Sequence, residues 1–600
     1  RPEHAETVRE HARVDLTDLV EGGLLQFESV AFERNVSLAS DIDRDVSVTG
    51  DAARLRRLDE SAQIVVLERT GYVSYANCGL PYYIGGVITD PEELTLQTPQ
   101  GFWNRFRVDV RVRHEATAID PAGKQVTVKN LETGEVTVEG YDKLLLAPGA
   151  APTRPPLPGL DSPRLFSLRT VEDTFRIRSF VERNRPKTAV LAGGGFISLE
   201  MAENLAEMGV EVTILQRIPQ LMNPLDYDMA TFLHSHLRRK GMHLRLNTAV
   251  AGFRQEGETI SALVEGGEAI PADLAILAIG VTPENALAKQ AGLALGSRGG
   301  IVVNQRMETS VPDIYAVGDA VEIPHLVTGE NTLISLAGPA NKQGRVAADN
   351  ICGGDSRYLG AQGSSVVKVC ELTVAATGLN EKAAQAAGLS YEKIVLSPLS
   401  HAGYYPGGKL MTMKVLYEKG SQRLLGAQIV GHEGVDKRID VLATAMQAGL
   451  PVTALKDLDL AYAPPYASAK DPVNLVGFMA ENLEQGVVKQ FHWEDVAGLP
   501  RDGSVTLLDA RTPGEYSGGC AEGFVNVPLD ELRDRLGEIA PGKPVYVMCQ
   551  SGLRSYLACR ILAQNGYDCY NFSGGYRFYE SVLLDRWTRQ NAYPCGVERP

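Results

Sequence analysis

The chain of 600 residues carries a formal net charge of −15 and is 44% hydrophobic, which predicts several ordinary globular domains. This acidic balance, with no long basic run, excludes nucleic acid and anionic membranes as partners in bulk. No apolar run is long enough to span a bilayer or to form a signal-peptide core, so we expect a cytoplasmic protein without a membrane partner. The eight cysteines form no C-x-x-C pair and the ten histidines no metal-ligand spacing, which favours a reducing compartment and no metal site.

The first 51 residues differ in character from the rest of the chain. A resemblance to the start of the ATP-binding domain of sensor histidine kinases is carried by VDLTDLVEGGLLQFESVAFERNVSLASDIDRDVSVTGDAARLRRL. That family continues with an Asn-containing helix and glycine-rich lid motifs, and neither follows here, so we exclude kinase activity. We interpret residues 1–51 as a gene fusion, a recombinant junction or an assembly artefact, with a natural regulatory arm as the alternative.

A nucleotide-binding βαβ unit follows, but only its second half is evident. Residues 46–69, VSVTGDAARLRRLDESAQIVVLER, predict a helix, a short connection and a buried strand that ends at Glu68. A strand and a glycine-rich turn should precede this helix, and only VSVTGD stands there. The sequence therefore raises the question of what replaces the phosphate-binding loop.

Strand, glycine turn and helix alternate from residue 62 to about 323. The segments that carry this pattern are AQIVVLE, YDKLLLAPGA, TAVLAGGGFISLEMAENLAEMGVEVTILQR, DLAILAIGVTPEN and DIYAVGDAVEI. They predict parallel sheets with crossover helices, in two systems of which one is inserted in the other. Residues 364–485 instead predict longer antiparallel strands with helices, an α+β domain. Residues 484–504 are interpreted as a linker into a last small α/β unit that runs from 505 to about 588.

The string GGGFIS (193–198) follows an apolar strand and opens an amphipathic helix, which is typical of dinucleotide binding. Gly193 permits the tight turn, Gly195 lets the backbone approach a pyrophosphate at the helix N-terminus, and Ser198 stands at the third glycine position as a small residue. The second strand ends at Gln216 and Arg217. Because no acid stands there to bind the ribose hydroxyls of NAD, the sequence slightly favours NADPH.

Two cysteines occupy positions where a thiol can react. Cys78 lies in SYANCGLPYY, after the strand that ends at Glu68, and no second cysteine follows it nearby. Its redox partner must then be external, or the thiol cycles through a sulfenic acid, with simple packing as the alternative. Cys549 opens CQSGLRS between an apolar strand and a helix, where backbone N–H groups, the helix dipole and Arg554 favour a thiolate. The loop is one residue shorter than the phosphate cradle of cysteine phosphatases, which suits a persulfide sulfur.

Residues from about 52 to 590 resemble the single-cysteine branch of the pyridine-nucleotide disulfide oxidoreductases. Most closely they resemble CoA-disulfide and NAD(P)H-dependent CoA-persulfide (polysulfide) reductases with a fused rhodanese domain. The motifs that carry the resemblance are SYANCGLPYY, LLLAPGAAPTRPPLPG, GGGFISLE, AIGVTPEN, IYAVGDAVE, LAGPANKQGR, HAGYYPGG, LAYAPPYASAKDPVN and CQSGLRS.

The resemblance implies an α/β fold of two nested Rossmann-like domains, an α+β dimerisation domain and a C-terminal rhodanese domain. The implied boundaries are an FAD-binding domain at 52–158 and 283–360, an NAD(P)-binding domain at 159–282, a dimerisation domain at 361–485, a linker at 486–504 and a rhodanese domain at 505–590. Residues 1–51 would replace the first FAD-binding strand and loop.

The resemblance also implies FAD, NAD(P)H and coenzyme A as ligands. The implied FAD and NAD(P)H contacts are Glu68, Arg69, Ala147, Gly149, Gly193, Gly195, Phe196, Ile197, Glu200, Gln216, Gly280, Gly318, Asp319, Leu336 and Ala337. The implied coenzyme A contacts are Arg54, Arg57, Ser74, Asn77, Asn341 and Arg345. Tyr404 and Tyr462 would reach the active site from the other subunit of a homodimer.

By the same resemblance, the expected reaction is flavin-dependent reduction of CoA disulfide, CoA persulfide or polysulfide by NAD(P)H through Cys78. Cys549 and Arg554 would serve a rhodanese site that carries the sulfane sulfur. Two alternatives remain: an NADH oxidase or peroxidase in which Cys78 forms a sulfenic acid, and a flavin-free chain in which only the rhodanese site is active.

The missing first loop is a departure from this family, whose members begin with a short strand and a G-G-V-A-G-G-type turn. We expect VSVTGD to imitate a strand and one glycine, which would leave the helix about two turns short. Those glycines hold the FAD pyrophosphate, so the hypothesis is that FAD binding is weakened or lost. The central strand of the first sheet would also be compromised.

Overall fold

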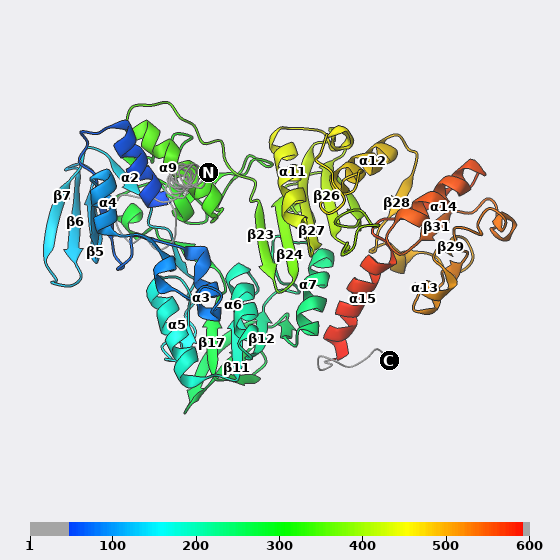
Figure 1. Cartoon of the computed structure of the whole chain (residues 1–600), viewed down its shortest axis with the longest axis horizontal. Helices are drawn as coiled ribbons and strands as arrows, with labels where there is room; N and C mark the ends of the chain where they lie inside the picture. Colours follow the sequence, from blue (N-terminus) through cyan, green and yellow to red (C-terminus); the bar gives the residue numbers. More distant parts are fainter. Residues whose placement is uncertain (1–46, 592–600) are drawn as a thin grey trace, which may run out of the picture.

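The computed structural model describes residues 47–591, which form four lobes in an elongated molecule (Figure 1). The histidine-kinase-like interpretation of residues 1–51 lies outside the described residues except for its last five. Within residues 47–591, no helix is both long and apolar enough to cross a membrane.

The first lobe contains two separate pairs of parallel strands. One pair joins β1 (Val65–Glu68) to β4 (Asp109–Val112), and the other joins β8 (Leu144–Leu146) to β20 (Ile314–Ala316). The described residues supply no strand that links these pairs into one sheet. The hypothesis of a compromised central strand agrees with this division. The lobe also holds an antiparallel sheet of β5 (His114–Asp120), β6 (Gln125–Asn130) and β7 (Val136–Gly140).

Helix α2 corrects the prediction for VSVTGD. The helix spans Ser47–Leu58, so the segment from Ser47 onward is helical and the predicted strand is wrong there. Ala52, Ala53 and Leu55 are buried, and α2 packs closely along α9 (Ala337–Ile351), where Ala348 is also buried. Packing against α9 stabilises α2 as a continuous helix. Each further helical residue adds a backbone hydrogen bond, and the small alanine side chains let the two helices approach closely.

The second lobe contains a five-stranded parallel sheet, which confirms the nested system predicted for residues 188–217. The strands, in spatial order, are β10 (Leu165–Phe166), β17 (Leu274–Leu277), β11 (Thr188–Ala192), β12 (Glu211–Gln216) and β13 (His243–Leu246). Its helices are α5 (Val171–Asn184), α6 (Phe196–Glu207) and α7 (Tyr227–Arg239). The central strands β11 and β17 are buried on both faces, as a parallel sheet with crossover helices requires.

The third lobe is the predicted α+β domain, built on a five-stranded antiparallel sheet. Its strands, in spatial order, are β23 (Ser365–Val369), β24 (Leu372–Gly378), β27 (Leu424–Gly431), β26 (Thr412–Glu418) and β25 (Tyr391–Leu396). Three helices belong to this lobe: α10 (Glu381–Ala386), α11 (Val435–Gln447) and α12 (Pro472–Glu484).

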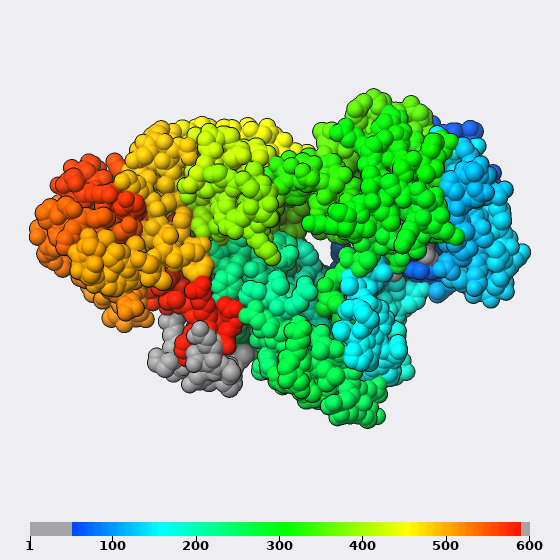
Figure 2. Space-filling model, turned by 180° about the vertical axis from the view of Figure 1, so that it is seen from behind, coloured from blue at the N-terminus to red at the C-terminus, as the bar shows by residue number. Residues whose placement is uncertain are grey.

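The fourth lobe is a small parallel α/β unit at the far end of the molecule from the first lobe (Figures 1 and 2). Its sheet is β28 (Lys489–Phe491), β32 (Cys569–Phe572), β31 (Val545–Met548), β29 (Thr506–Asp509) and β30 (Val525–Asn526). Its helices are α13 (Pro513–Ser517), α14 (Leu553–Gln564) and α15 (Gly575–Asn591). Helix α15 leaves this unit and packs on α7 of the second lobe.

Candidate active site

A cavity of about 1450 Å³ lies between the first three lobes and contains the predicted redox cysteine. Figure 2 shows the surface hollowed between the first and second lobes. Cys78 is exposed in a short 3-10 turn, Asn77–Gly79, that precedes helix α3 (Leu80–Gly85). The predicted site residues that line this cavity are Asn77, Cys78, Gly193, Gly195, Phe196, Ile197, Glu200, Gln216, Gly280, Asp319, Leu336 and Ala337.

The glycine loop of the second lobe has the geometry that a bound pyrophosphate requires. Gly193 adopts φ +118°, and a Cβ there would lie 2.1 Å from the carbonyl oxygen of Ala278. Gly195 caps the N-terminus of α6 without a side-chain hydrogen bond, and a Cβ on it would meet nothing within 4 Å. An open, glycine-lined helix N-terminus fits the pyrophosphate of NAD(P)H.

Glu200, one turn into α6, lies close to the loop of Cys78. Burial and the neighbouring charge of Glu203 raise the pKa of Glu200 to about 7. Burial, together with Glu200, Glu203 and Cys78, raises the pKa of Tyr82 to about 12. The cavity wall therefore holds a carboxyl group that gains or loses a proton near neutral pH, within the electrostatic reach of the turn that carries the cysteine.

The strand ends of the first lobe gather the residues predicted for FAD. Glu68 ends β1 and Arg69 follows it; Ala147 and Gly149 follow β8, and Gly318 and Asp319 follow β20. Because β8 and β20 are parallel, their carboxyl ends meet at one edge, where ligands of open α/β sheets bind. Helix α9 starts at Ala337, and its N-cap, Leu336, makes no side-chain cap, so its N–H groups are open to a ligand. These residues fit the adenosine and flavin ends of FAD.

The helix expected to face the FAD pyrophosphate carries an unexpected acid. Asp51 of α2 is 2% exposed, and its Oδ2 has no hydrogen-bond partner among the residues described. The side chain points at α9, where a Cβ on Gly344 would lie 1.9 Å from Oδ1. Burial raises the pKa of Asp51 well above its usual value.

The residues predicted to bind coenzyme A lie near the first lobe's helices, but only Asn77 lines the cavity. Arg54 pairs with Asp349 at 2.8 Å, which joins α2 to α9. Asn341 donates to the carbonyl oxygen of Ala337, while its buried Oδ1 has no hydrogen-bond partner in the described part of the chain. That oxygen is a buried acceptor, and Asn341 does not line the cavity.

Tyr404 and Tyr462 come together although 58 residues separate them in sequence. Their hydroxyl oxygens lie 2.6 Å apart, and both side chains are exposed on the third lobe. Neither residue lines the cavity of its own chain. Tyr405 and Tyr466 are exposed too, so the third lobe carries four exposed tyrosines.

Cys549 stands at the end of β31, as its sequence context predicts. The side chain is fully buried, and its Sγ receives hydrogen bonds from the N–H of Gly552 at 3.1 Å and the hydroxyl of Ser555 at 3.2 Å. Gly552 adopts φ +97°, which turns the loop so that its amide faces the sulfur. Neither Gly552 nor Ser555 was singled out from the sequence, although both belong to the string GLRS.

Arg554 does not face the sulfur as an isolated cation. Its guanidinium makes two hydrogen bonds to the carboxylate of Glu515, at 2.7 and 2.6 Å. This pairing holds the pKa of Glu515 at about 2 and offsets the positive charge predicted for Arg554. The neighbouring Arg511 is buried, binds Asp509 and reaches Gln550 beside Cys549. Arg511 and Glu515 lie 38 and 34 residues before Cys549 and were not predicted.

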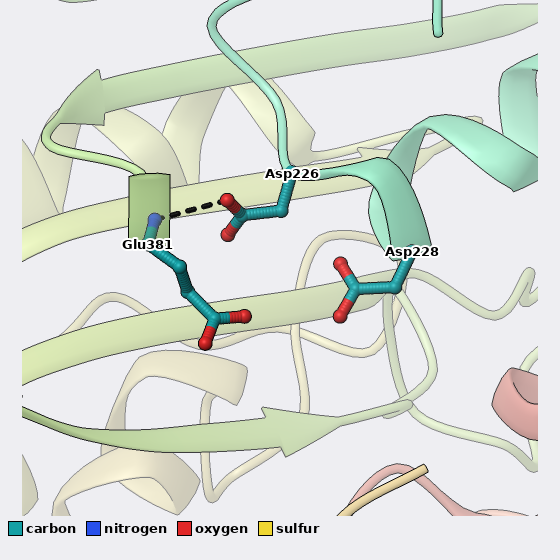
Figure 3. A group of neighbouring side chains, drawn as sticks. All are labelled: Asp226, Asp228 and Glu381. Atoms are coloured by element: carbon teal, nitrogen blue, oxygen red, sulfur yellow. Dashed lines mark hydrogen bonds between the residues drawn. The ribbon is translucent and has the colours of Figure 1, made fainter. Parts of the chain in front are cut away.

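One cluster of acids resembles a cation site but is already filled. Asp226, Asp228 and Glu381 lie close together at the junction of the second and third lobes (Figure 3). The ammonium of Lys414 bonds to Asp228 at 2.8 Å, pairs with Asp226 at 3.0 Å and also contacts Glu381. Lys414 therefore occupies the place where a metal ion would sit, and the cluster is an internal ion pair between lobes.

Comparison with known proteins identifies the lobes. A family model described as pyridine nucleotide-disulphide oxidoreductase matches residues 49–344, and the model of its dimerisation domain matches 364–472. A coenzyme A disulfide reductase of Staphylococcus haemolyticus is 34% identical over 433 residues, which are 72% of this chain and 96% of the relative. The chain belongs to the pyridine nucleotide-disulphide oxidoreductase family. A rhodanese-like domain model matches residues 492–581, so the oxidoreductase carries a rhodanese-like lobe.

Solved structures support the same identification. The crystal structure of reduced Bacillus anthracis CoADR-RHD is 47% identical, has a TM-score of 0.87, and the match covers 89% of this chain and 96% of that chain. A NAD-dependent persulfide reductase from A. fulgidus is 37% identical with a TM-score of 0.83, and the match covers 88% and 97%. The predicted fold class is confirmed, and the family to which this chain belongs uses FAD and NAD(P)H. The hypothesis that FAD binding is weakened in this chain stays a prediction.

Proposed function

We propose that this oxidoreductase uses NAD(P)H to reduce CoA disulfide or CoA persulfide through Cys78. The observation that carries the proposal is the placement of Cys78 in the same cavity as the dinucleotide loop and the N-terminus of α9. Cys78 is the one cysteine among the described residues that line this cavity, so a small-molecule thiol has to act as its disulfide partner.

The bonds that change are few. The Cys78 thiolate attacks one sulfur of CoA disulfide, the S–S bond breaks, one CoA thiolate leaves, and a mixed disulfide forms. When bound, FAD supplies two electrons taken from NAD(P)H, which return Cys78 to the thiolate and release the second CoA thiolate. Glu200 lies within this cavity, where its raised pKa lets it hold or release a proton near neutral pH.

The rhodanese-like lobe supports a sulfur-loading role for Cys549. Its sulfur already accepts hydrogen bonds from Gly552 and Ser555, and the same donors stabilise a terminal sulfur's negative charge after persulfide formation. A sulfane sulfur carried by Cys549 and passed to coenzyme A would give CoA persulfide. The Cys78 thiolate would then attack the outer sulfur of that persulfide, so that the S–S bond breaks, the CoA thiolate leaves and a Cys78 persulfide forms. Two electrons from NAD(P)H, passed on by FAD when it is bound, would break the Cys78 persulfide bond, restore the Cys78 thiolate and release hydrosulfide.

The paired tyrosines support a homodimer. Tyr404 and Tyr462 present adjoining hydroxyls on an exposed surface of the dimerisation domain, away from their own chain's cavity. Such a pair can reach the cavity of a second copy, where the hydroxyls would donate to a leaving thiolate. Exposed aromatic side chains with polar tips are enriched at interfaces.

The test uses Cys78→Ser and Cys549→Ser in the full chain, with released FAD quantified for each. Cys78→Ser should lose CoA-disulfide-dependent NAD(P)H oxidation by at least about 1000-fold, since the attacking thiolate is gone, while thiosulfate loading of Cys549 persists. Cys549→Ser should lose thiosulfate loading and keep CoA-disulfide-dependent NAD(P)H oxidation. Reductase activity that survives Cys78→Ser, or peroxide-dependent oxidation that exceeds the CoA-disulfide rate, would contradict the proposal.

A further inference from the structure

A buried carboxylate lies where the last helix of the rhodanese-like lobe packs on the dinucleotide-binding lobe. Helix α15 lies along α7, and Figures 1 and 2 both show it running back from the fourth lobe to the second. Asp585 of α15 is 1% exposed. It accepts hydrogen bonds from the hydroxyl of Tyr227 at 2.7 Å and from Arg238 at 2.7 Å, and pairs with Arg589 at 3.2 Å.

A fully buried histidine, His234, joins this carboxylate to the second lobe. Its Nδ1 lies 3.0 Å from Asp585 Oδ1, and its Nε2 lies 3.1 Å from the backbone nitrogen of Leu221. Since the Leu221 N–H can only donate, Nε2 has to accept and the proton stays on Nδ1. Burial lowers the pKa of His234. Burial would raise the pKa of Asp585, but His234 and Arg238 hold it below its usual range. The two groups are thus a neutral imidazole and a carboxylate.

The residue that His234 holds, Leu221, is fully buried and lies behind the glycine loop of the dinucleotide site. The Leu221 side chain packs on Gly194, where an added Cβ would lie 2.6 Å from Leu221 Cδ2. The next residue, Met222, donates its N–H to the carbonyl oxygen of Gly194 at 2.8 Å. Arg217, Ile218 and Asn223 from the same segment line the cavity.

We propose that Asp585 and His234 are positioning residues for the dinucleotide loop, so that the docked helix of the rhodanese-like lobe sets the affinity for NAD(P)H. The order of contacts is Asp585, His234, the 221–222 backbone, and then Gly194. The proposal rests on the dinucleotide site alone. It is independent of which disulfide or persulfide Cys78 reduces.

The test variant is His234→Phe in the full chain. Phenylalanine keeps the ring but offers no acceptor to the Leu221 amide, while Tyr227 and Arg238 still hold Asp585. Loss of this buried hydrogen bond should raise the Kd of NADPH and NADH three- to tenfold, measured by fluorescence titration without a sulfur substrate. KM for the dinucleotide should rise with it, while kcat stays within about twofold and sulfur loading of Cys549 is unchanged.

Ser581→Ala is the matched control. Ser581 lies on the same face of α15 and its hydroxyl is 2.8 Å from that of Thr231, but it contacts neither His234 nor Leu221. Its Kd should stay within twofold of the unaltered chain. His234→Gln, whose amide offers both a donor and an acceptor, should recover part of the lost affinity.

Asp585→Asn serves as the second variant if His234→Phe does not fold. It keeps the size of the side chain but replaces the carboxylate that accepts from His234 Nδ1–H with a neutral amide, which weakens this contact, so the Kd should rise in the same direction. An unchanged dinucleotide Kd in either variant that folds overturns the proposal, as does an equal rise in the Ser581→Ala control. Because binding is measured without a disulfide, failure of the CoA-reductase assignment would leave these outcomes intact.

Discussion

The two dinucleotide-binding units of this chain differ at the place where a pyrophosphate should lie. In the second lobe, β11, a glycine loop and α6 follow one another, and the sheet continues through five paired strands. In the first lobe, α2 is described from Ser47, and the parallel pairs β1–β4 and β8–β20 stand apart from one another. Among the described residues, buried side chains and the Arg54–Asp349 ion pair hold α2 beside α9.

The two units also differ in the residues at the start of the helix that would face the pyrophosphate. A side chain at Gly193 would strike the backbone of Ala278, and one at Gly194 would strike the side chains of Leu221 and Gln216. At Asp51, the corresponding helix holds a buried acid against Gly344 instead. The second lobe thus allows a close approach of backbone at the start of α6, whereas the first lobe buries a destabilising polar group, Asp51, between α2 and α9.

The largest expected effect is that of Gly193→Ala in the second unit. An alanine Cβ would lie 2.1 Å from the carbonyl oxygen of Ala278, at φ +118°, where L-residues are strained. We expect the free energy of unfolding to fall by on the order of 3–5 kcal/mol, with loss of NAD(P)H binding. Denaturant unfolding followed in parallel with dinucleotide titration measures both.

Gly195→Ala is the control for that prediction, because a Cβ there meets nothing within 4 Å and its φ is −92°. It should fold with normal stability and affect only the approach of the pyrophosphate. Equal losses of stability in the two variants would show that the contact with Ala278 does not cause the destabilisation by Gly193→Ala.

The second prediction is that a substitution at Asp51 raises the free energy of unfolding, whereas Gly193→Ala lowers it. Asp51→Ala removes a buried acid without a hydrogen-bond partner for Oδ2, so the free energy of unfolding should rise by about 1–3 kcal/mol at pH 7. Burial raises the folded-state pKa of this carboxyl above the usual 3.8. The penalty is therefore absent below the unfolded pKa and grows as pH rises toward the folded pKa. The increase in the free energy of unfolding caused by Asp51→Ala should therefore become smaller as the pH falls from 7 to 4.

Asp51→Asn separates charge from polarity at the same position. It removes the ionisation but keeps a buried polar group, so it should gain less than Asp51→Ala and lose the pH dependence. A decrease in stability for both variants would show that Asp51 has a stabilising role in the α2–α9 packing and would contradict the prediction.

The second unit could be predicted from sequence because its determinants are local. GGGFIS, the apolar strand before it and the amphipathic helix after it all lie within 30 residues. In the first unit, the helix and the buried strand that ends at Glu68 were predicted correctly, but the start of the helix was not. VSVTGD is compatible with a strand by composition, and the helix includes Ser47 onward because Ala52, Ala53 and Leu55 bury against α9, almost 300 residues away. Long-range packing overrode local preference there.

The reactive sites show the same contrast between local sequence, which was predictable, and long-range contacts, which were not. Cys78 and Cys549 were found through their loops, whereas the partners that set their surroundings come from distant segments. Glu515 neutralises Arg554 across 39 residues, and Asp585 reaches His234 across 351. No periodicity or spacing encodes such pairs, because they depend on how whole lobes dock.

The smallest predicted effect tests the third glycine position of the second unit. Ser198 is fully buried, and its hydroxyl donates to the carbonyl oxygen of Gly193 at 2.8 Å, so the serine secures the loop as well as being small. Ser198→Ala should lower the free energy of unfolding by about 1 kcal/mol and weaken NAD(P)H binding by no more than a few fold. Ser421→Ala, at an exposed serine that bonds to Glu418, should change stability by less than about 0.5 kcal/mol. If Ser198→Ala matched that control, the hydroxyl would not hold the loop, and the serine would stand at the third position for its size alone.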